Sequence, residues 1–305
     1  MTKQIHTFLL NLLRSAQKTA FGKQLIAVLH RSGAYFFVAA ALNRAVAKQN
    51  RGNPTPEMLT SREYFAANKA RADEVASRLL DDASRDCYYK MLDFRCNSAA
   101  ENFPDSDPTA TYFWNEHFTE WKDEVLVDCG AYIGDSITQF KKAVKTHGGS
   151  YRKIIAFEPD AENYAILTKT HKDVIAYKSG VWSKDDTLTF NEGNGLLSGV
   201  VAWGNVSVDV KSIDSCRECN DATFIKMDIE GSEMEALEGA RNTISANKPR
   251  LAISIYHSNE DMIRLAEWIY GNFPEYSLFV RQHRKYSIVE TVLYAFVPRP
   301  NTAKS

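Results

Sequence analysis

The stretch VDCGAYIGDS at residues 127–136 joins the end of an apolar run to the start of an amphipathic one through two glycines. Asp128 ends the apolar run, and Gly130 and Gly134 follow it. This pattern is typical of the first strand–turn–helix unit of a doubly wound α/β sheet, where ligands bind at the carboxyl ends of the strands. Glycine allows the backbone there to turn with a positive φ and to approach a ligand closely. An ordinary corner between strand and helix uses glycine in the same way. The stretch by itself therefore predicts the fold but not a ligand.

The spacing of the glycines distinguishes two kinds of nucleotide site. A dinucleotide-binding loop reads GxGxxG and seats a pyrophosphate, whereas this loop reads GxxxG with Tyr132 and Ile133 inside it. The next apolar run ends in FEPD, where Glu158 is placed to accept hydrogen bonds from two ribose hydroxyls and Pro159 ends the strand. Without a phosphate cradle, the pattern favours a nucleoside that lacks phosphates. S-adenosylmethionine is such a ligand, and Asp128 is placed to attract its amino or sulfonium charge.

From Glu124 onward, short apolar runs alternate with amphipathic helices, which predicts a mainly parallel sheet covered on both faces. The two runs at 187–190 and 206–213 alternate with a period of two and predict an antiparallel excursion. The last two strands have no helix between them, so we expect them to pair antiparallel at one edge, as in the class I methyltransferase version of the Rossmann-like fold. We expect strands at 125–129, 153–157, 174–177, 187–190, 206–213, 223–227, 250–255, 276–280 and 291–297. We also expect Asp160 to cap the helix after the second strand, and a single helix from Glu230 that carries Leu237, Ala240 and Ile244 on one face.

The part of the chain before Glu124 has a helical pattern instead. The sequence NPTP at 53–56 breaks this pattern, and Thr60 with Glu63 forms a capping box that predicts a new helix start. We therefore expect a helical N-terminal region at 1–120 and a methyltransferase-like domain at 121–305. Apolar residues at helical spacing predict one buried face in the region after the break: Phe65, Ala72, Val75 and Leu79.

Composition and charge exclude several classes of protein. The 305 residues are 44% hydrophobic and 25% charged with a net charge of −1, which excludes a disordered or fibrous chain and gives no electrostatic case for nucleic acid. Residues 1–56 hold eight Lys and Arg and no acidic residue, which leaves 29 basic and 38 acidic residues, or −9, in the remainder. Because apolar residues are interleaved with these charges, peripheral membrane contact through residues 1–50 is one expectation, and packing on the acidic domain is the alternative. We expect a cytoplasmic protein, membrane-associated at most, without a signal peptide.

The five cysteines do not predict a metal or disulfide framework. Their odd number and wide scatter fit a reducing compartment. Cys216 and Cys219 form one CxxC, whereas a structural zinc site would need a second pair. We therefore expect no zinc site.

Six stretches together carry a family resemblance: VDCGAYIGDS, IIAFEPD (154–160), VSVDVKSID (206–214), FIKMDIEGSEMEALEGA (224–240), KPRLAISIYHSNED (248–261) and ETVLYAFV (290–297). Over about 125–297 the chain resembles the FkbM family of S-adenosylmethionine-dependent methyltransferases, and the run at 224–240 is the most specific part. The chain departs from many members after the fifth strand, where it reads Ile255-Tyr256-His257 rather than containing Glu. The resemblance implies an oxygen nucleophile, such as a sugar hydroxyl of a glycan or glycosylated metabolite.

The catalytic candidates lie at the ends of the fourth and fifth strands. Alternation places Lys226 and Asp228 on one side, where the loop would face the cofactor methyl group. Asp228 is the candidate general base for the acceptor hydroxyl, with Lys226 or His257 assisting. In the alternative, Lys226 and Asp228 neutralise one another and Glu230 favours the start of the next helix. Asp228, Glu230 and His257 have the chemistry to hold a divalent metal, but no contiguous motif supports one, so we expect no metal.

Three residues after the third strand complete the predicted cofactor site, because the adenine edge lies there in this fold: Ser179, Gly180 and Val181. The other members predicted from the sequence are Asp128, Gly130, Tyr132, Gly134, Glu158 and Pro159. Two rivals stand beside a methyltransferase that acts on a small-molecule or glycan acceptor. An NAD-dependent dehydrogenase or epimerase is opposed by the GxxxG loop and by the missing Tyr-x-x-x-Lys pair. A binding protein that kept the fold without catalysis is opposed by the acidic residues at the strand ends.

Overall fold

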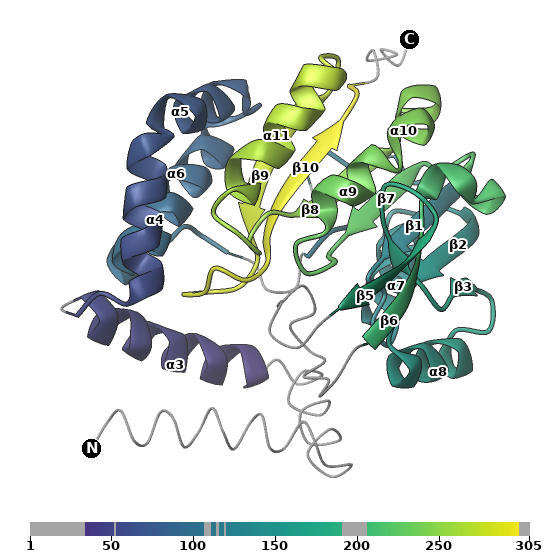
Figure 1. Ribbon diagram of the computed structural model, residues 1–305, viewed down its shortest axis with the longest axis horizontal. Coiled ribbons are helices and arrows are strands. Elements are labelled where there is room, and N and C mark those ends of the chain that lie inside the picture. Colours follow the sequence, from purple (N-terminus) through teal and green to yellow (C-terminus); the bar gives the residue numbers. More distant parts are fainter. Residues whose placement is uncertain are drawn as a thin grey trace.

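The fold is built on a seven-stranded sheet with the order β3-β2-β1-β7-β8-β10-β9 (Figure 1). The computed structural model describes residues 34–51, 53–106, 111–113, 116–118, 120–190 and 206–298. The strands of this sheet are β1 (Glu124–Cys129), β2 (Tyr151–Phe157), β3 (Ile175–Tyr177), β7 (Phe224–Met227), β8 (Arg250–Ser254), β9 (Ser277–Gln282) and β10 (Thr291–Phe296).

The strand directions confirm the predicted fold class. β1 pairs in parallel with β2 and β7, and β7 pairs in parallel with β8. β10 inserts antiparallel between β8 and β9, so the predicted antiparallel pair closes one edge. The chain leaves β1 toward β2 and β3 and later returns to β7 on the other side, which makes the gap between β1 and β7 the topological switch point.

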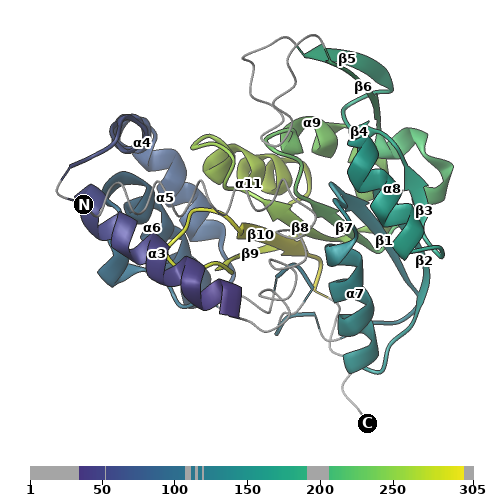
Figure 2. The same cartoon turned by 90° about the horizontal axis from the view of Figure 1, so that it is seen from below.

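A separate three-stranded sheet with the order β4-β6-β5 forms the predicted excursion. Its strands are β4 (Gly180–Val181), β5 (Asp186–Phe190) and β6 (Val206–Lys211). β5 and β6 pair antiparallel, as their alternating pattern predicts. Figure 2 shows this pair projecting away from the main sheet.

Helices cover both faces of the main sheet, and its strands are correspondingly apolar on both sides. All six residues of β1 are buried. Alternate residues of β1 therefore enter two different cores: Val125 and Val127 pack with one set of helices, and Leu126 packs with the other. Figure 2 shows α7 (Asp135–Thr146) on one side of the sheet and α9 (Glu233–Glu238) and α11 (Asp261–Asn272) on the other.

Two further helices extend these layers. α8 (Ala161–Thr170) follows β2, and Asp160 caps it as predicted, accepting from the backbone N–H groups of Glu162 and Asn163 at 2.9 and 2.8 Å. α10 (Arg241–Asn247) follows α9 directly, so the single helix predicted from Glu230 is divided in two near Gly239. Short 3-10 turns occur at η1 (Ala100–Asn102), η2 (Ile213–Ser215) and η3 (Arg217–Cys219).

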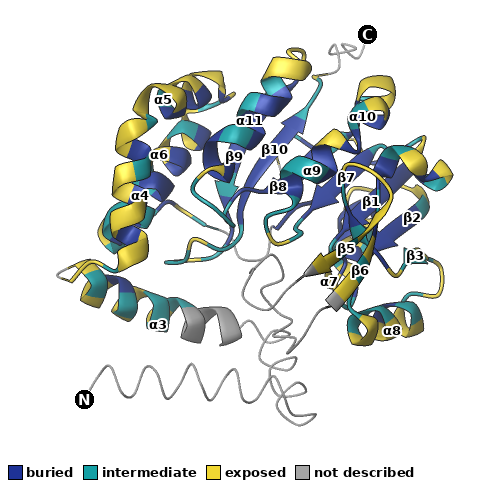
Figure 3. Cartoon of the chain, in the orientation of Figure 1, coloured by how far each residue is buried: buried dark blue, intermediate teal, exposed yellow. Residues whose placement is uncertain are grey.

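The N-terminal part is helical, as predicted, and it shares a core with the sheet. Its described helices are α3 (Ala34–Arg51), α4 (Pro56–Ala67), α5 (Lys69–Arg78) and α6 (Asp82–Asn97). α4, α5 and α6 bury their inner faces and expose their outer faces (Figure 3), and Ala47 is the buried residue among those of α3 whose burial is described. The four apolar residues predicted to share a face, from Phe65 to Leu79, all belong to the same core as β1 and α11. A boundary at residue 120 between two domains stays a prediction.

The predicted helix start at Thr60 is wrong. α4 begins one turn earlier, where the Thr55 side chain accepts from the Met58 backbone N–H at 3.4 Å and Pro56 occupies the first turn. Proline suits that position because its missing N–H would have no intrahelical partner. Thr60 lies inside the helix and donates to the Pro56 carbonyl at 3.0 Å.

Among the described helices, none combines the length and the apolar character that crossing a bilayer requires. Most of the basic N-terminal segment for which we expect membrane contact, residues 1–33, lies outside the described residues.

Candidate functional site

The carboxyl ends of four parallel strands bring the predicted site residues to one edge of the sheet. Cys129 at the end of β1 is paired with Phe157 of β2 and with Met227 of β7. The next residue along each strand is therefore at the same level: Gly130, Glu158 and Asp228. His257 follows the neighbouring strand β8 and lies 3.4 Å from Asp228.

Gly130 allows the loop after β1 to lie against the loop after β7. Its φ is +78°, and a Cβ built on it would meet the backbone oxygen of Asp228 at 2.0 Å. Any side chain there would push the two loops apart at the switch point. The sequence predicts that a side chain at this position obstructs a ligand, and the structure adds a collision within the protein itself.

The carboxylate of Glu158 is buried and oriented by two backbone groups. Tyr132 N–H donates to Oε2 at 2.8 Å, and Asp160 N–H donates to Oε1 at 2.9 Å. The intervening Pro159 has no N–H of its own to offer. Burial raises the pKa of Glu158, and these backbone bonds oppose the rise. The Asn163 side chain is also hydrogen-bonded to Glu158, and since a carboxylate accepts about four hydrogen bonds in all, a position stays available for a ligand.

Asp128 and Lys226 form a buried pair beneath the loop. Lys226 Nζ lies 3.1 Å from Asp128 Oδ1, and both side chains are almost wholly buried. The same ammonium donates to the carbonyl oxygens of Cys129 and Gly130 at 3.2 and 2.7 Å. Asp128 also accepts a hydrogen bond from the Ser136 hydroxyl. Lys226 thus makes its direct ion pair with Asp128, while its charge also acts on Asp228, and it fixes the position of the Gly130 loop.

Asp228 lies at the centre of a polar cluster. Its two oxygens accept hydrogen bonds from the hydroxyls of Tyr112 and Tyr256 at 2.8 and 2.9 Å. Burial works to raise the pKa of Asp228, but the positive charges of Lys226 and His257 outweigh it and lower the pKa. Asp228 is therefore ionised at neutral pH, and about a quarter of its side chain is accessible.

His257 lies between three carboxylates. Its Nδ1 is 3.1 Å from Glu233 Oε1, and its Nε2 is 3.4 Å from Asp228 Oδ1 and 3.6 Å from Glu230 Oε2. Burial alone would lower the pKa of His257, but the contact with Glu233 raises it above its ordinary value. The structure thus brings Asp228, Glu230 and His257 together as the sequence predicts, with Glu233 in addition.

The predicted adenine-edge residues follow β3, whose end is tied to Glu158, and two of them belong to the second sheet. The Glu158 N–H donates to the carbonyl of Tyr177 at 3.1 Å, which ties the end of β2 to the end of β3. Ser179 follows that point, is buried, and its hydroxyl has no hydrogen-bond partner among the described residues. Gly180 and Val181 continue into β4 and pair with β6.

Two other predicted cofactor residues line the loop after β1. Tyr132 has a φ of 49° and is 54% exposed, so its ring is available on the surface above Glu158. Gly134 has a φ of +90°, and a Cβ there would meet the His171 ring at 2.3 Å. Gly134 therefore serves the packing of α8 on the loop, as well as the turn into α7.

Three members of the cluster are absent from the sequence-based prediction. Glu233 and Tyr256 lie inside the stretches that carry the family resemblance, next to predicted residues. Their position in those stretches could have identified them as candidate site residues. Tyr112 lies in the region assigned to the N-terminal part, and its backbone N–H donates to the Tyr294 hydroxyl at 3.1 Å. No motif surrounds Tyr112, and only the folded chain shows that it reaches Asp228.

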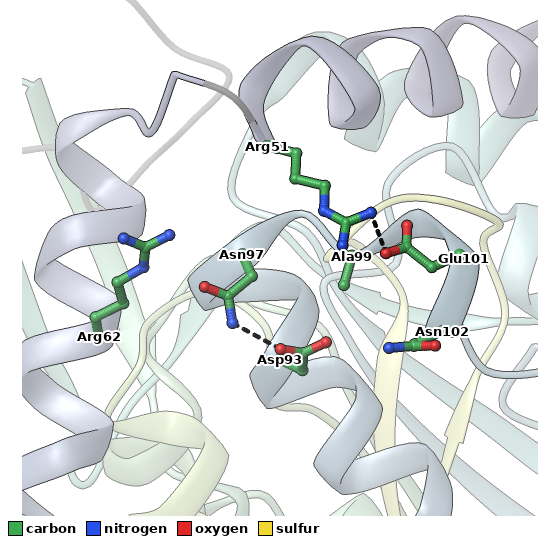
Figure 4. A pocket seen from close by; sticks show the side chains of 7 residues that line it. All are labelled: Arg51, Arg62, Asp93, Asn97, Ala99, Glu101 and Asn102. Atoms are coloured by element: carbon green, nitrogen blue, oxygen red, sulfur yellow. Dashed lines mark hydrogen bonds and ion pairs between the residues drawn. The ribbon is translucent and has the colours of Figure 1, made fainter.

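One cavity lies elsewhere and is lined by none of the predicted site residues. It measures about 340 Å³ and lies between α3, α4 and α6 (Figure 4). Arg51 pairs there with Glu101, and Asn97 donates to Asp93 at 2.6 Å. Its polar groups are largely engaged with one another, so the strand ends stay the candidate site.

Comparison with known families and structures gives one strong match. The model of the methyltransferase FkbM domain matches residues 128–288, more than half of the chain. A crystal structure of methyltransferase FkbM from Methylobacillus flagellatus KT is 29% identical, with a TM-score of 0.66 over 77% of this chain and 60% of that one. This chain therefore spans less than two thirds of the length of that protein.

Other solved structures are more distant. An rRNA methylase from Streptococcus thermophilus is 13% identical, with a TM-score of 0.37 over 59% of this chain and 90% of that one. A putative methyltransferase from Streptococcus mutans in complex with SAH is 8% identical, with a TM-score of 0.34 over 58% of this chain and 90% of that one. A search of curated proteins finds no match.

Proposed function

The chain belongs to the FkbM methyltransferase family, and we propose that it transfers a methyl group from S-adenosylmethionine to a hydroxyl of a small-molecule or glycan acceptor. The observation that carries the proposal is the Glu158 carboxylate. It is fixed by two backbone N–H groups at the carboxyl end of β2, and the carboxylate keeps acceptor capacity for a ribose hydroxyl.

The residues around Glu158 fit a nucleoside cofactor without phosphates. The close approach of the Gly130 loop to Asp228 sets one wall of the crevice, and Tyr132 lies exposed above it. Ser179, with its unpartnered buried hydroxyl, offers a polar contact on the adenine side. S-adenosylmethionine bound here would supply a methyl group on a positively charged sulfur.

The cluster around Asp228 would receive the acceptor hydroxyl. Asp228 is ionised, partly accessible and held by two tyrosine hydroxyls, so it is placed to orient the hydroxyl and to draw off its proton. His257 supports the charge of Asp228 from 3.4 Å. Alignment of the acceptor oxygen with the methyl group would supply much of the rate. Lys226 contributes by holding the Gly130 loop rather than by moving a proton.

A sugar hydroxyl suits the chemistry of this cluster. Its groups are hydroxyls, carboxylates and an imidazole, which bind a polyhydroxylated acceptor by hydrogen bonds: Tyr112, Asp228, Glu230, Tyr256 and His257. The family resemblance also points to an oxygen nucleophile. We therefore propose a glycan or a glycosylated metabolite as the acceptor.

Transfer of a tritiated methyl group to glycan and metabolite extracts tests this function. We expect the unmodified chain to label an acceptor and Asp228→Asn to lose about 10²–10⁴ of the turnover, because the amide can no longer take the proton. Asp173→Asn, an exposed carboxylate of the α8–β3 connection, serves as the control and should keep full turnover. Equal turnover in Asp228→Asn and the unmodified chain would contradict the role of Asp228.

A further inference from the structure

The buried side of the Asp228 cluster contains polar atoms that the described protein does not satisfy. Glu233 is fully buried, and its Oε2 has no hydrogen-bond partner among the described residues. Both ring nitrogens of His257, whose side chain is 9% exposed, also lack a partner with hydrogen-bond geometry. An orphaned carboxylate oxygen beside two ring nitrogens that contact carboxylates without hydrogen-bond geometry is unusual, because buried polar groups are normally paired and each exception costs free energy.

The donor set and its spacing fit a metal ion. Asp228, Glu233 and His257 each offer one ligand atom, and these atoms all lie within 4.8 Å of one another. Ligand atoms at about 2.1 Å from one cation lie roughly 3.0–3.4 Å apart in octahedral or tetrahedral geometry, so side-chain shifts of up to about 1 Å would close the set. Two carboxylates and one imidazole form a set that first-row divalent cations accept.

We propose that Asp228, Glu233 and His257 bind one divalent cation on the acceptor side of the crevice. One ring nitrogen of His257 would bind the cation, and the other would donate its N–H to a neighbouring carboxylate. The structure already places a carboxylate beside each nitrogen, Glu233 at 3.1 Å from Nδ1 and Asp228 and Glu230 near Nε2. A carboxylate behind the ligating histidine is the usual arrangement at protein metal sites, because it fixes the tautomer.

The charges around the cluster leave room for a cation. In the part of the chain that the structure describes, Lys226 is the buried ammonium nearest the site, and it pairs with Asp128. His257 is the basic group in ion-pair contact with Asp228 and Glu233. Two carboxylates therefore share one imidazole, and a divalent cation would balance them.

A second cluster contains the same residue types but has an arginine between its carboxylates. Asp81, Glu116 and His117 also lie within 4.8 Å of one another. There, however, the guanidinium of Arg281 lies 3.0 Å from Asp81 and 2.5 Å from Glu116. An arginine thus occupies the position that a cation would take, which makes this cluster a control within the same molecule.

The catalytic role of this cation rests on the proposed function, because a cation at Asp228 would act on the acceptor of the methyl group. The acceptor oxygen could bind the cation directly, and coordination lowers the pKa of a hydroxyl and orients it. The proton would then leave to the solvent or to a neighbouring carboxylate, while the oxygen attacks the methyl carbon, the sulfur–methyl bond breaks and S-adenosylhomocysteine is released. Binding of the cation itself can be measured without any methyl transfer.

Electron paramagnetic resonance of Mn²⁺ tests the site, because the signal of the free ion falls when the ion binds protein. The full chain is freed of metal with a chelator and titrated with Mn²⁺ alone. We expect one bound ion per chain, with the affinity lowered about 10–100-fold or more in Glu233→Gln and in His257→Gln. His117→Gln, in the cluster that Arg281 fills, should bind Mn²⁺ as the unmodified chain does.

Titration of S-adenosylhomocysteine into the same samples separates this proposal from the proposed function and reports that the cofactor crevice is intact. An unmodified chain that binds S-adenosylhomocysteine but takes up no Mn²⁺ would overturn the cation site and leave the methyltransferase assignment standing. One bound ion that is lost in His257→Gln supports the site even if no acceptor is ever methylated. Loss of the ion in His117→Gln with retention in His257→Gln would also overturn the proposal.

Discussion

The position of Gly130 shows how a single residue sets the geometry of the crevice. Its φ of +78° is unfavourable for any other residue, and a Cβ would collide with the Asp228 carbonyl oxygen. We expect Gly130→Ala to lower the free energy of unfolding by about 1–3 kcal/mol and to weaken binding of S-adenosylhomocysteine. Urea unfolding monitored by circular dichroism measures the first effect.

Gly271 in α11 offers a matched control for this substitution. A Cβ there meets no atom within 4 Å, and alanine favours a helix over glycine, so Gly271→Ala should be neutral or stabilise by up to about 1 kcal/mol. Equal stability of the two variants would show that the Gly130 loop does not need its close approach to β7.

The residue types of the site were predictable, but their pairing was not. Motif spacing placed Glu158, Asp228 and His257 at strand ends, and the structure brings all three to one edge. The partner of Lys226 depends instead on register, because Lys226 lies directly opposite Asp128 on the neighbouring strand. Alternation within β7 suggested Asp228 as the partner, and nothing in the sequence specifies which residue of β1 lies alongside.

At the scale of elements, α6 is joined to β9 through one carboxylate. Asp81 caps α6 by accepting from the Ser84 N–H at 2.7 Å and pairs with Arg281 of β9 at 3.0 Å. Burial works to raise the pKa of Asp81, but Arg281, Ser84 and His117 outweigh it and hold the pKa well below its ordinary value. The charged form is therefore the one that stabilises the fold.

This shift predicts a pH-dependent stability. The folded pKa lies below the unfolded one, so the contribution of Asp81 is complete above the unfolded pKa of about 4 and is lost as the pH falls further. We expect Asp81→Asn to lower the free energy of unfolding by about 1–3 kcal/mol at pH 7, with the difference shrinking below about pH 4. Denaturant unfolding of both proteins across this range measures it.

The neighbouring Asp82 provides the control, since its side chain is 99% exposed and also lies in the first turn of α6. Asp82→Asn should change the stability by less than about 0.5 kcal/mol. A difference for Asp81→Asn that persists unchanged at pH 3 would show that the charge of Asp81 is not what stabilises the helix.

The strands were easier to predict than the helix ends. Apolar runs of β1, β2 and β7 are decisive because parallel strands are buried on both faces. The division of the predicted helix after Glu230 comes from a distant residue: Asp214 accepts from the N–H groups of Asn242 and Thr243 at 2.9 and 2.8 Å and so starts α10. A cap supplied by another part of the chain leaves no local pattern.

At the scale of the whole molecule, the described part of the basic N-terminal segment contacts the rest of the chain. Ala47 of α3 is buried, Arg44 lies over the Tyr286 ring at 5.4 Å, and Arg51 pairs with Glu101. These contacts support packing on the rest of the chain as the role of α3. Membrane contact, if the segment provides it, would then fall to residues 1–33.

Co-sedimentation with anionic vesicles at low salt tests this division of roles. We expect a chain without residues 1–33 to stay in the supernatant, since Arg44, Ala47 and Arg51 of α3 contact the rest of the chain, and the full chain is the comparison. Equal pelleting of both chains would contradict the internal role of α3.

The association of Tyr112 with Asp228 also belongs to this scale. The change from a helical to an alternating strand–helix pattern separates residues 1–120 from the catalytic part, yet the Tyr112 hydroxyl donates to Asp228 at 2.8 Å. A sequence pattern reports local structure, whereas this contact depends on how residues 111–113 and 116–118 pack against the sheet. The site is therefore built by both parts of the chain.

Calorimetric titration with S-adenosylhomocysteine and, separately, with NAD tests the central claim most directly. We expect S-adenosylhomocysteine to bind one molecule per chain and NAD to give no heat of binding. Glu158→Gln should weaken S-adenosylhomocysteine binding about 10–100-fold, because charge-assisted bonds of this kind contribute about 1.5–3 kcal/mol, whereas Glu162→Gln, four residues further on and exposed, should leave it unchanged. Binding of NAD alone, or unchanged affinity in Glu158→Gln, would contradict the account.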